Sequence, residues 1–157
     1  MHIRLIAVGD RQPAWVDEAF DTYVARFPRE WKFRMDALPS GRRGKSDKST
    51  RARDEESLQV LGKTGANERI VLLDEAGGQF SSRQLAERLA RWQSDGRDLC
   101  FVIGGPDGVS PSLLERADLV WSLSDLTLPH GLARVLFAEQ LYRAWTLLSG
   151  HPYHRSG

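Results

Sequence analysis

The end of the chain places side chains that can stack, exchange a proton and bind phosphate next to one another. Tyr153, His154 and Arg155 are consecutive, and His151 lies two positions before Tyr153. A tyrosine ring can stack on an unpaired nucleobase, a histidine can handle a proton near neutral pH, and an arginine can hold phosphate. A frayed terminus is the ordinary alternative. His151 and His154 make a poor metal site because no third ligand accompanies them.

A glycine-rich turn is a second place where the chain can hold a ligand. It reads Gly104-Gly105-Pro106-Asp107-Gly108 and follows an apolar run. The turn lacks the lysine of a phosphate-binding P-loop and the glycine spacing of a dinucleotide fold. Glycines still let a flat ligand approach the backbone closely. A tight turn between a strand and a helix explains the same residues equally well.

Two further polar features follow predicted strands. The segment 122–130 carries small polar side chains and ends on His130, where a long helix begins, and Asp74 follows another apolar run. A capped connection explains the segment, and a cap explains Asp74 better than a catalytic acid does. Generic chemistry assigns a function to neither feature.

The positive charge of the chain is concentrated in residues 26–53. Ten basic residues stand against three acidic ones, so this segment carries a net charge of +7, whereas the whole chain carries +1. Such a segment is a candidate for binding nucleic-acid phosphates, although a solvated loop is the commoner explanation. Its basic residues are Arg26, Arg29, Lys32, Arg34, Arg42, Arg43, Lys45, Lys48, Arg51 and Arg53.

These candidates must be positioned by strands and helices that alternate along the chain. Alternation of this kind predicts an α/β domain with a mainly parallel sheet, in which ligands bind at the carboxyl ends of the strands. Apolar or alternating runs predict strands over residues 3–8, 31–37, 69–73, 99–103 and 119–123. Predicted helix starts are Pro13, Ser81 or Ser82, Ser110-Pro111 and Pro129, and predicted helix ends are Gly96 and Gly150. A loop from Pro39 to about Thr50 precedes a polar helix that ends at about Leu61.

Length and composition fit one soluble domain. A chain of 157 residues can bury a core, and its 41% hydrophobic and 27% charged residues exclude a wholly disordered or fibrous protein. Cys100 is the single cysteine, which excludes an internal disulfide and suits a reducing compartment. No apolar run approaches the roughly 20 residues of a membrane span. We expect a cytoplasmic protein whose core includes Cys100, Trp15, Trp92 and Trp145, with a subunit interface as the alternative place for Trp145.

Three carboxyl-terminal motifs together resemble one protein family. The chain is similar to the bacterial large-subunit ribosomal RNA methyltransferase H family, within the SPOUT superfamily of knotted methyltransferases. The similarity covers essentially the whole chain, including the opening 7–9, the helix end 23–27 and the loop 41–45. The three motifs are Ile103–Gly108, Ser122–His130, and the helix and tail residues Arg134, Glu139–Ala144 and His151–His154.

The resemblance implies a fold and a cofactor. The expected fold is a single domain over residues 1–157, and its carboxyl-terminal third forms a trefoil knot, which is an exception among protein connections. The implied methyl donor is S-adenosylmethionine, held by the knot loops. The implied cofactor contacts are Leu73, Gly104, Leu123, Ser124, Asp125, Leu126, Thr127 and Leu128.

The resemblance also implies a homodimer that methylates N3 of a pseudouridine in 23S ribosomal RNA, with the assembled ribosome as partner and no metal. N3 carries a proton at neutral pH, so a base or a cation that stabilises negative charge must act. The candidates for proton handling are His130, Tyr153 and His154, with Arg134 for the developing charge. The RNA-binding candidates are Arg42, Arg43, Lys45, Arg143 and Arg155.

Two other classes of function stay open at this point. One is a different α/β enzyme with a nucleotide cofactor, against which the missing glycine fingerprint is evidence. The other is a non-enzymatic protein of the same fold that binds RNA or the ribosome. Binding of S-adenosylmethionine separates both from the methyltransferase.

Overall fold

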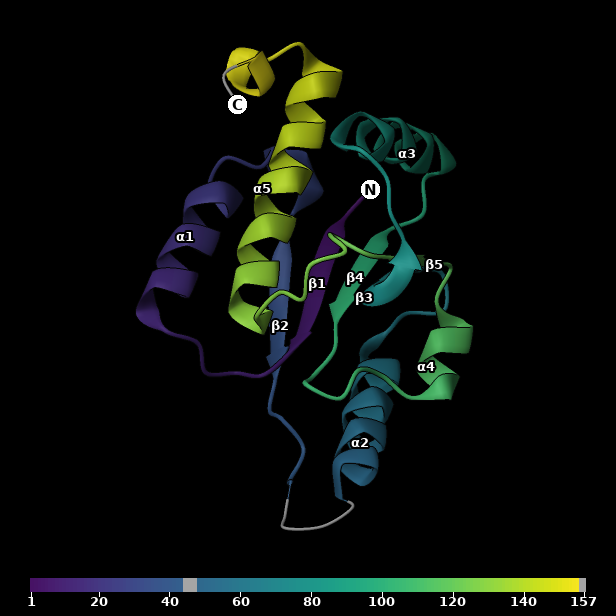
Figure 1. Cartoon of the computed structure of the whole chain (residues 1–157). Helices are drawn as coiled ribbons and strands as arrows, with labels where there is room; N and C mark the ends of the chain where they lie inside the picture. The colour runs from purple at the N-terminus through teal and green to yellow at the C-terminus, as the bar shows by residue number, and fades with distance from the viewer. Residues whose placement is uncertain (44–47, 156–157) are drawn as a thin grey trace.

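A computed structural model describes residues 1–43 and 48–155 of the chain. Within these residues five strands form a parallel sheet in the order β2-β1-β4-β3-β5, as Figure 1 shows. The strands are β1 (Ile3–Val8), β2 (Arg34–Leu38), β3 (Arg69–Gly78), β4 (Leu99–Ile103) and β5 (Leu119–Trp121). The helices are α1 (Ala14–Val24), α2 (Lys48–Lys63), α3 (Ser82–Asp95), α4 (Pro111–Arg116) and α5 (His130–Ser149).

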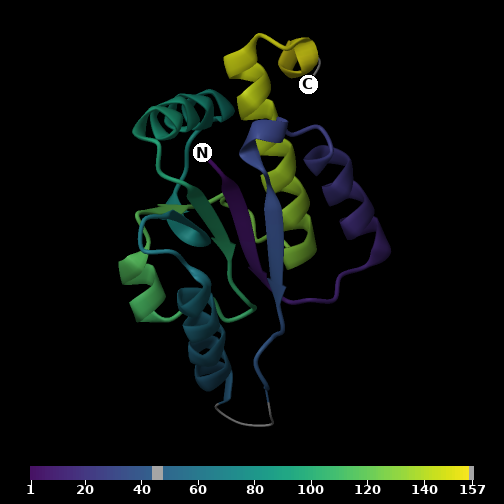
Figure 2. The same cartoon turned by 180° about the vertical axis from the view of Figure 1, so that it is seen from behind.

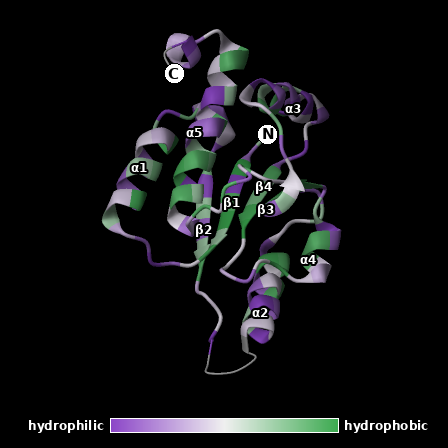
Figure 3. Cartoon of the chain, in the orientation of Figure 1, coloured by the Kyte–Doolittle hydropathy of each residue, from purple (hydrophilic) through white to green (hydrophobic). Residues whose placement is uncertain are grey.

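Helices cover both faces of the sheet, which confirms the predicted α/β class. Leu5 and Ala7 of β1 pack in the cluster that includes side chains of α1, α3 and α5, whereas Ile6 and Val8 pack with residues of α2 and α4. Figure 2, from behind, shows α2 on the near side of the sheet and α5 on the far side. Both faces are apolar, and Figure 3 accordingly shows the central strands largely in green.

The predicted helix boundaries on either side of the later strands are confirmed. Ser81 caps α3 through a hydrogen bond from the Gln84 amide, and Gly96 ends it in a left-handed conformation. Ser110 caps α4, and Gly150 ends α5. In the described part of the chain, no helix is long and apolar enough to cross a membrane.

Two predictions about aromatic residues were wrong. Residues 31–37 are not one strand, because Arg29–Trp31 form a 3-10 turn, Lys32 has φ 45°, and β2 begins only at Arg34. The aromatic spacing there comes from a cluster in which Phe27 packs edge-on against Trp31, with ring centroids 5.2 Å apart. Trp15 lies on the outer side of α1 and is 56% exposed, so it does not belong to the core.

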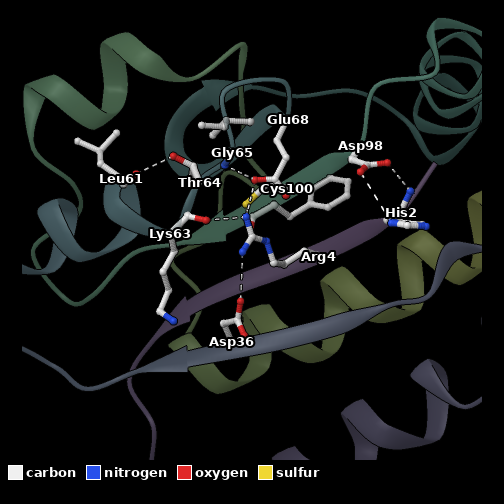
Figure 4. A network of polar contacts seen from close by, with 12 residues as sticks. His2, Arg4, Asp36, Leu61, Lys63, Thr64, Gly65, Glu68, Asp98 and Cys100 are labelled. Carbon is white, nitrogen blue, oxygen red and sulfur yellow. Dashed lines mark hydrogen bonds and ion pairs between the residues drawn. The ribbon is translucent and has the colours of Figure 1, made fainter.

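A partly buried polar network fixes the amino-terminal end of the sheet (Figure 4). The Arg4 guanidinium donates to the Lys63 carbonyl at the end of α2 over 2.8 Å, and it is paired with Glu68 and with Asp36. Cys100 lies beside this network, and burial raises the pKa of its thiol to about 12. The thiol therefore remains protonated and packs as a small apolar group, as predicted.

Replacing Arg4 by Met is expected to lower the free energy of unfolding by about 3 kcal/mol, because it leaves the largely buried Glu68 carboxylate without its cation. The double variant Arg4→Met/Glu68→Gln should recover part of this loss, since it removes the uncompensated charge. Urea denaturation of the three proteins measures both changes. A loss below about 1 kcal/mol for Arg4→Met would show that the pair contributes no more than a surface ion pair.

Candidate active site

A cavity of about 820 Å³ lies at the carboxyl ends of the strands. This is the edge at which parallel α/β sheets bind their ligands, and the volume falls in the range of about 300–1,000 Å³ typical of small-molecule sites. The loops after β1, β2, β4 and β5, the carboxyl half of β3 and the first turn of α5 form its walls. The lining includes Val8–Gly9 and Arg11–Gln12 after β1, Ser40, Leu73–Ala76, Ile103–Val109, Ser122–Ser124, Leu126–Leu128, His130 and Ala133.

The structure brings together almost all of the residues predicted to contact the cofactor. Seven of them line the cavity, although they come from three separate segments of the chain. Asp125 is the exception, because its carboxylate accepts a hydrogen bond from the Gln79 side chain instead. The seven lining residues are Leu73, Gly104, Leu123, Ser124, Leu126, Thr127 and Leu128.

The glycine-rich loop after β4 is a tight turn whose backbone forms one wall of the cavity. The Gly108 amide donates to the Gly105 carbonyl over 3.1 Å, and Gly108 has φ 75°. A Cβ atom at Gly104 would lie 2.8 Å from Cγ1 of Val109, so the chain needs glycine there to close the turn. The two interpretations of this loop are therefore compatible, since the tight turn itself exposes backbone to the cavity.

The loop after β5 is held in shape by its own serines. The Ser122 hydroxyl donates to the Ser124 carbonyl over 2.9 Å, and the Ser124 hydroxyl accepts from the Leu126 amide over 3.0 Å. The Ser122 amide also donates to the carbonyl of Gly78, over 2.9 Å, which ties the loop to β3. Main-chain groups next to the cavity are thus fixed without bulky side chains.

His130 stands at the start of α5 and lines the cavity, whereas Arg134 is buried one turn further on, with 2% of its surface exposed. Arg134 donates from Nε to Nε2 of His130 over 2.9 Å and from a second nitrogen to the Gly9 carbonyl. Burial, followed by the charge of Arg134, lowers the pKa of His130 to about 4. The imidazole is therefore neutral at pH 7, and the lone pair on Nε2 is occupied by the arginine.

The lowered pKa of His130 predicts a loss of stability in weak acid. A free histidine titrates near pH 6.5, so between pH 6.5 and about 4 the unfolded chain binds a proton that the folded chain excludes, and stability falls as the pH falls. We expect His130→Asn to flatten the decline in melting temperature between pH 6.5 and 4.5. His2→Asn, a change at an exposed histidine far from the cavity, should leave the decline unchanged. Parallel curves for wild type and His130→Asn would contradict the assignment.

The predicted residues of the tail lie far from the cavity within one chain. Helix α5 has 20 residues and is therefore about 30 Å long, and it begins at the cavity while the tail follows its other end (Figure 1). Residues Pro152–Arg155 form a 3-10 turn there. Tyr153 and His154 consequently cannot reach the cavity lined by His130 in the same molecule.

Tyr153 is docked on α5 rather than frayed. Its ring packs against Tyr142, with centroids 4.7 Å apart, and lies under the guanidinium of Arg143 at 5.1 Å. Its hydroxyl donates to Glu139 over 3.2 Å, and the same carboxylate pairs with Arg143. Burial, together with the charge of Glu139, raises the pKa of Tyr153 to about 12, so the phenol keeps its proton at neutral pH.

The basic segment 26–53 does not form one surface. Arg26 lies over the Tyr142 ring near the tail, whereas Arg42 and Arg43 follow the opposite end of β2. Arg42 is exposed, but Arg43 is paired with Glu56 and Asp107 inside the chain. Of these two arginines, therefore, Arg42 is available to bind phosphate and Arg43 is already paired. Lys45 lies outside the described residues.

Sequence reasoning missed the wall of the cavity that follows β1. Arg11 and Gln12 lie in the connection to α1, and Ser40 follows β2. The sequence could have indicated these residues, because each follows the carboxyl end of a predicted strand, where ligands bind. Asp74 also lines the cavity, but it lies inside β3, which continues to Gly78, rather than just after the strand, and its side chain accepts a hydrogen bond from the Ala76 amide over 2.9 Å.

Comparisons with known proteins show which family the chain belongs to. The family model described as "Predicted SPOUT methyltransferase" matches residues 1–154. Ribosomal RNA large subunit methyltransferase H from Pseudomonas fluorescens is 50% identical over 155 residues, which are 99% of this chain and 100% of that protein.

Two solved structures share the fold at low sequence identity. A methylase-family protein from Haemophilus influenzae has a TM-score of 0.57 and 11% identity, over 98% of this chain and 69% of that one. Another from Neisseria gonorrhoeae has a TM-score of 0.55 and 13% identity, over 90% and 81%. The chain therefore belongs to the SPOUT methyltransferase family and, within it, to the family of the ribosomal RNA large subunit methyltransferases H.

Proposed function

We propose that the protein transfers a methyl group from S-adenosylmethionine to N3 of a pseudouridine in 23S ribosomal RNA, on the assembled ribosome in the cytoplasm. The observation that carries this proposal is the cavity that joins Leu73, Gly104 and the loop 122–128 at one edge of the sheet. The name of the 50% identical relative supports the choice of ribosomal RNA as substrate.

The residues around the cavity fit S-adenosylmethionine chemically. The ligand supplies an activated methyl group on a positively charged sulfur, next to an amino acid with an ammonium and a carboxylate. The wall carries the carboxylates of Asp74, Glu75 and Asp107 for positive charge and the guanidinium of Arg11 for negative charge. Apolar Leu73, Leu123 and Leu126 would cover a flat base.

The acceptor nitrogen must lose its proton, and the contacts of the three candidate bases lead us to favour His154. His130 is neutral at pH 7, but the Nε2 lone pair already accepts from Arg134. Tyr153 keeps its own proton, since its pKa is raised to about 12. His154 remains as the proton acceptor, with Tyr153 as a stacking surface for the base. Arg134 then acts as a positioning residue that orients His130.

A second copy of the chain must supply the tail. The roughly 30 Å between the two ends of α5 separates His154 from the cavity in one molecule, so the site is complete only when a partner's tail reaches it. A twofold homodimer would place two tails at two cavities. Trp15 on α1 and Leu148 on α5 are exposed apolar side chains that such an interface would cover. The exposed Arg42 and Arg155 would then contact RNA phosphates, and Arg143 would do so only by exchanging its pairing with Glu139 for a phosphate.

A paired measurement tests this proposal. Calorimetry of the purified chain with S-adenosylmethionine should give one binding site per subunit, and ribosomes that lack the modification should accept tritium from the labelled donor at N3 of pseudouridine. Ribosome binding without donor binding would instead support a non-enzymatic RNA-binding protein. Sedimentation of the same preparation determines whether the active species is a dimer.

A further inference from the structure

Two adjacent residues of α2, Glu56 and Ser57, are buried against the glycine-rich loop although neither lines the cavity. Each has 2% of its surface exposed. A buried carboxylate is costly unless a cation and hydrogen-bond donors compensate it, so its partners indicate what it stabilises. Nothing in the proposed chemistry uses these two side chains.

The negative charge of the buried Glu56 carboxylate is compensated by groups in the segment that follows β2. The Arg43 guanidinium donates to both of its carboxylate oxygens, over 2.8 and 3.0 Å, and the Gly41 amide donates over 2.7 Å. Two parallel hydrogen bonds of this kind fix orientation as well as charge. They also raise the pKa of Arg43, so the guanidinium keeps its positive charge.

The same carboxylate touches the backbone of the glycine-rich loop. A Cβ atom at Gly105 would lie only 2.7 Å from Oε1 of Glu56. The φ angle of Gly105 is not positive, so backbone conformation does not explain why glycine stands at this position. The close approach of Glu56 explains it, because it leaves no room for a side chain. Glu56 and the loop are therefore packed directly against each other.

Two further contacts hold the rest of the loop. Arg43 donates from Nε to Asp107 over 2.8 Å, and Asp107 lines the cavity. Beyond the turn, the Ser110 amide donates to the Ser57 hydroxyl over 2.8 Å. The loop is thus held at Gly105, Asp107 and Ser110 by groups outside the cavity.

We infer that Arg43, Glu56 and Ser57 form a clamp that preorganises the glycine-rich loop for the methyl donor. A loop with three glycines among five residues loses much conformational freedom when it is ordered, and a ligand binds more tightly when the protein has already met that cost. The inference rests on the proposed function, because it concerns the affinity for S-adenosylmethionine. It also assigns Arg43 to the positioning of the donor rather than to the binding of RNA phosphate.

Glu56→Gln tests the clamp with almost no change in side-chain volume. We expect the dissociation constant and the KM for S-adenosylmethionine to rise about tenfold, while kcat at saturating donor and the KM for ribosomes stay at wild-type values. Glu55→Gln is the matched control, because Glu55 is the adjacent residue and, among the described residues, its exposed carboxylate pairs with Arg51 on the same helix and not with the glycine-rich loop. It should bind the donor like the wild type.

A double-mutant cycle on Arg43→Gln and Asp107→Asn isolates the contact between these two side chains. If Arg43 acts by holding Asp107, the dissociation constant of the double variant for the donor should equal that of whichever single variant binds the donor less tightly. If the fold-increases in the dissociation constant caused by the two single substitutions multiply in the double variant, Arg43 does not act through Asp107. Ser57→Ala is the milder change should Glu56→Gln fail to fold, and its expected rise in the dissociation constant is about threefold.

The affinity of the wild-type protein for S-adenosylmethionine is measured first, so that the proposed function and the clamp can be contradicted separately. Absence of donor binding by the wild type would overturn the proposed function. Wild-type affinity in folded Glu56→Gln and Arg43→Gln proteins would overturn the clamp alone. A fall in melting temperature and kcat with an unchanged dissociation constant would also overturn it, since it would show that these residues only stabilise the fold.

Discussion

Gly104→Val is expected to weaken the binding of S-adenosylmethionine by about 100-fold or more, which is the largest effect we expect from one substitution. A Cβ atom at this position would lie 2.8 Å from Cγ1 of Val109 and 3.2 Å from the Gly108 carbonyl oxygen. The two γ-methyl groups of valine add further volume at the end of β4. The loop must open to accept them, and the wall of the cavity is lost with it.

The control adds the same side chain where there is room. Beyond its chain neighbours and the backbone of its own helix, no atom of the described residues lies within 4 Å of the position that a Cβ would take at Gly62 on α2, so Gly62→Val should bind the donor normally. Calorimetry measures both affinities, and circular dichroism checks that both proteins are folded. A folded Gly104→Val protein with wild-type affinity would show that the donor binds elsewhere.

The strands and caps of this fold could be predicted because their causes are local. Ser81, Gly96, Ser110 and Gly150 act within one or two turns of a helix, and the apolar runs of β1, β3 and β4 are long enough to exclude exposure of either face. The prediction for residues 31–37 failed for the opposite reason. Trp31 is buried through aromatic partners, so its spacing carries no information about a strand.

The candidate site could be predicted where it is built from neighbours along the chain. The loop 122–128 and His130 form one segment, and the structure places them around the same cavity, apart from the Asp125 side chain. Arg43 could not be interpreted from the sequence, because its partner Glu56 becomes a buried carboxylate only when α2 packs on the glycine-rich loop. The net charge of a segment includes such an arginine even though a carboxylate from another part of the chain already neutralises it.

The distance between the two ends of α5 is the other property that sequence patterns do not reveal. His130 and His154 are candidates of the same chemical type, and both flank the same helix. Only the rise of about 1.5 Å per residue over that helix separates them by about 30 Å. The proposed roles of Tyr153 and His154 therefore depend on a partner subunit, which gives the prediction with the second largest effect.

Deletion of residues 153–157 is expected to abolish methylation of ribosomes while leaving donor affinity and dimerisation near normal. The deleted residues include His154 and Tyr153, whereas the cavity lies at the other end of α5 and the exposed Trp15 is retained. Tritium transfer to ribosomes measures methylation, and calorimetry on the same preparation measures donor binding. Full methylation by the truncated protein would show that the tail has no part in the reaction.

A mixture of two inactive variants distinguishes a tail that acts across the dimer from one that acts within its own subunit. The truncated protein keeps its cavity but lacks a tail, and Gly104→Val keeps its tail but lacks a working cavity. Random reassembly makes half of the dimers mixed, and each mixed dimer has one site with both parts if the tail crosses to the partner. The mixture should then recover about a quarter of the wild-type rate. No recovery, with mixed dimers verified by mass spectrometry, would contradict the composite site, because a tail acting in its own subunit leaves every site in the mixture incomplete.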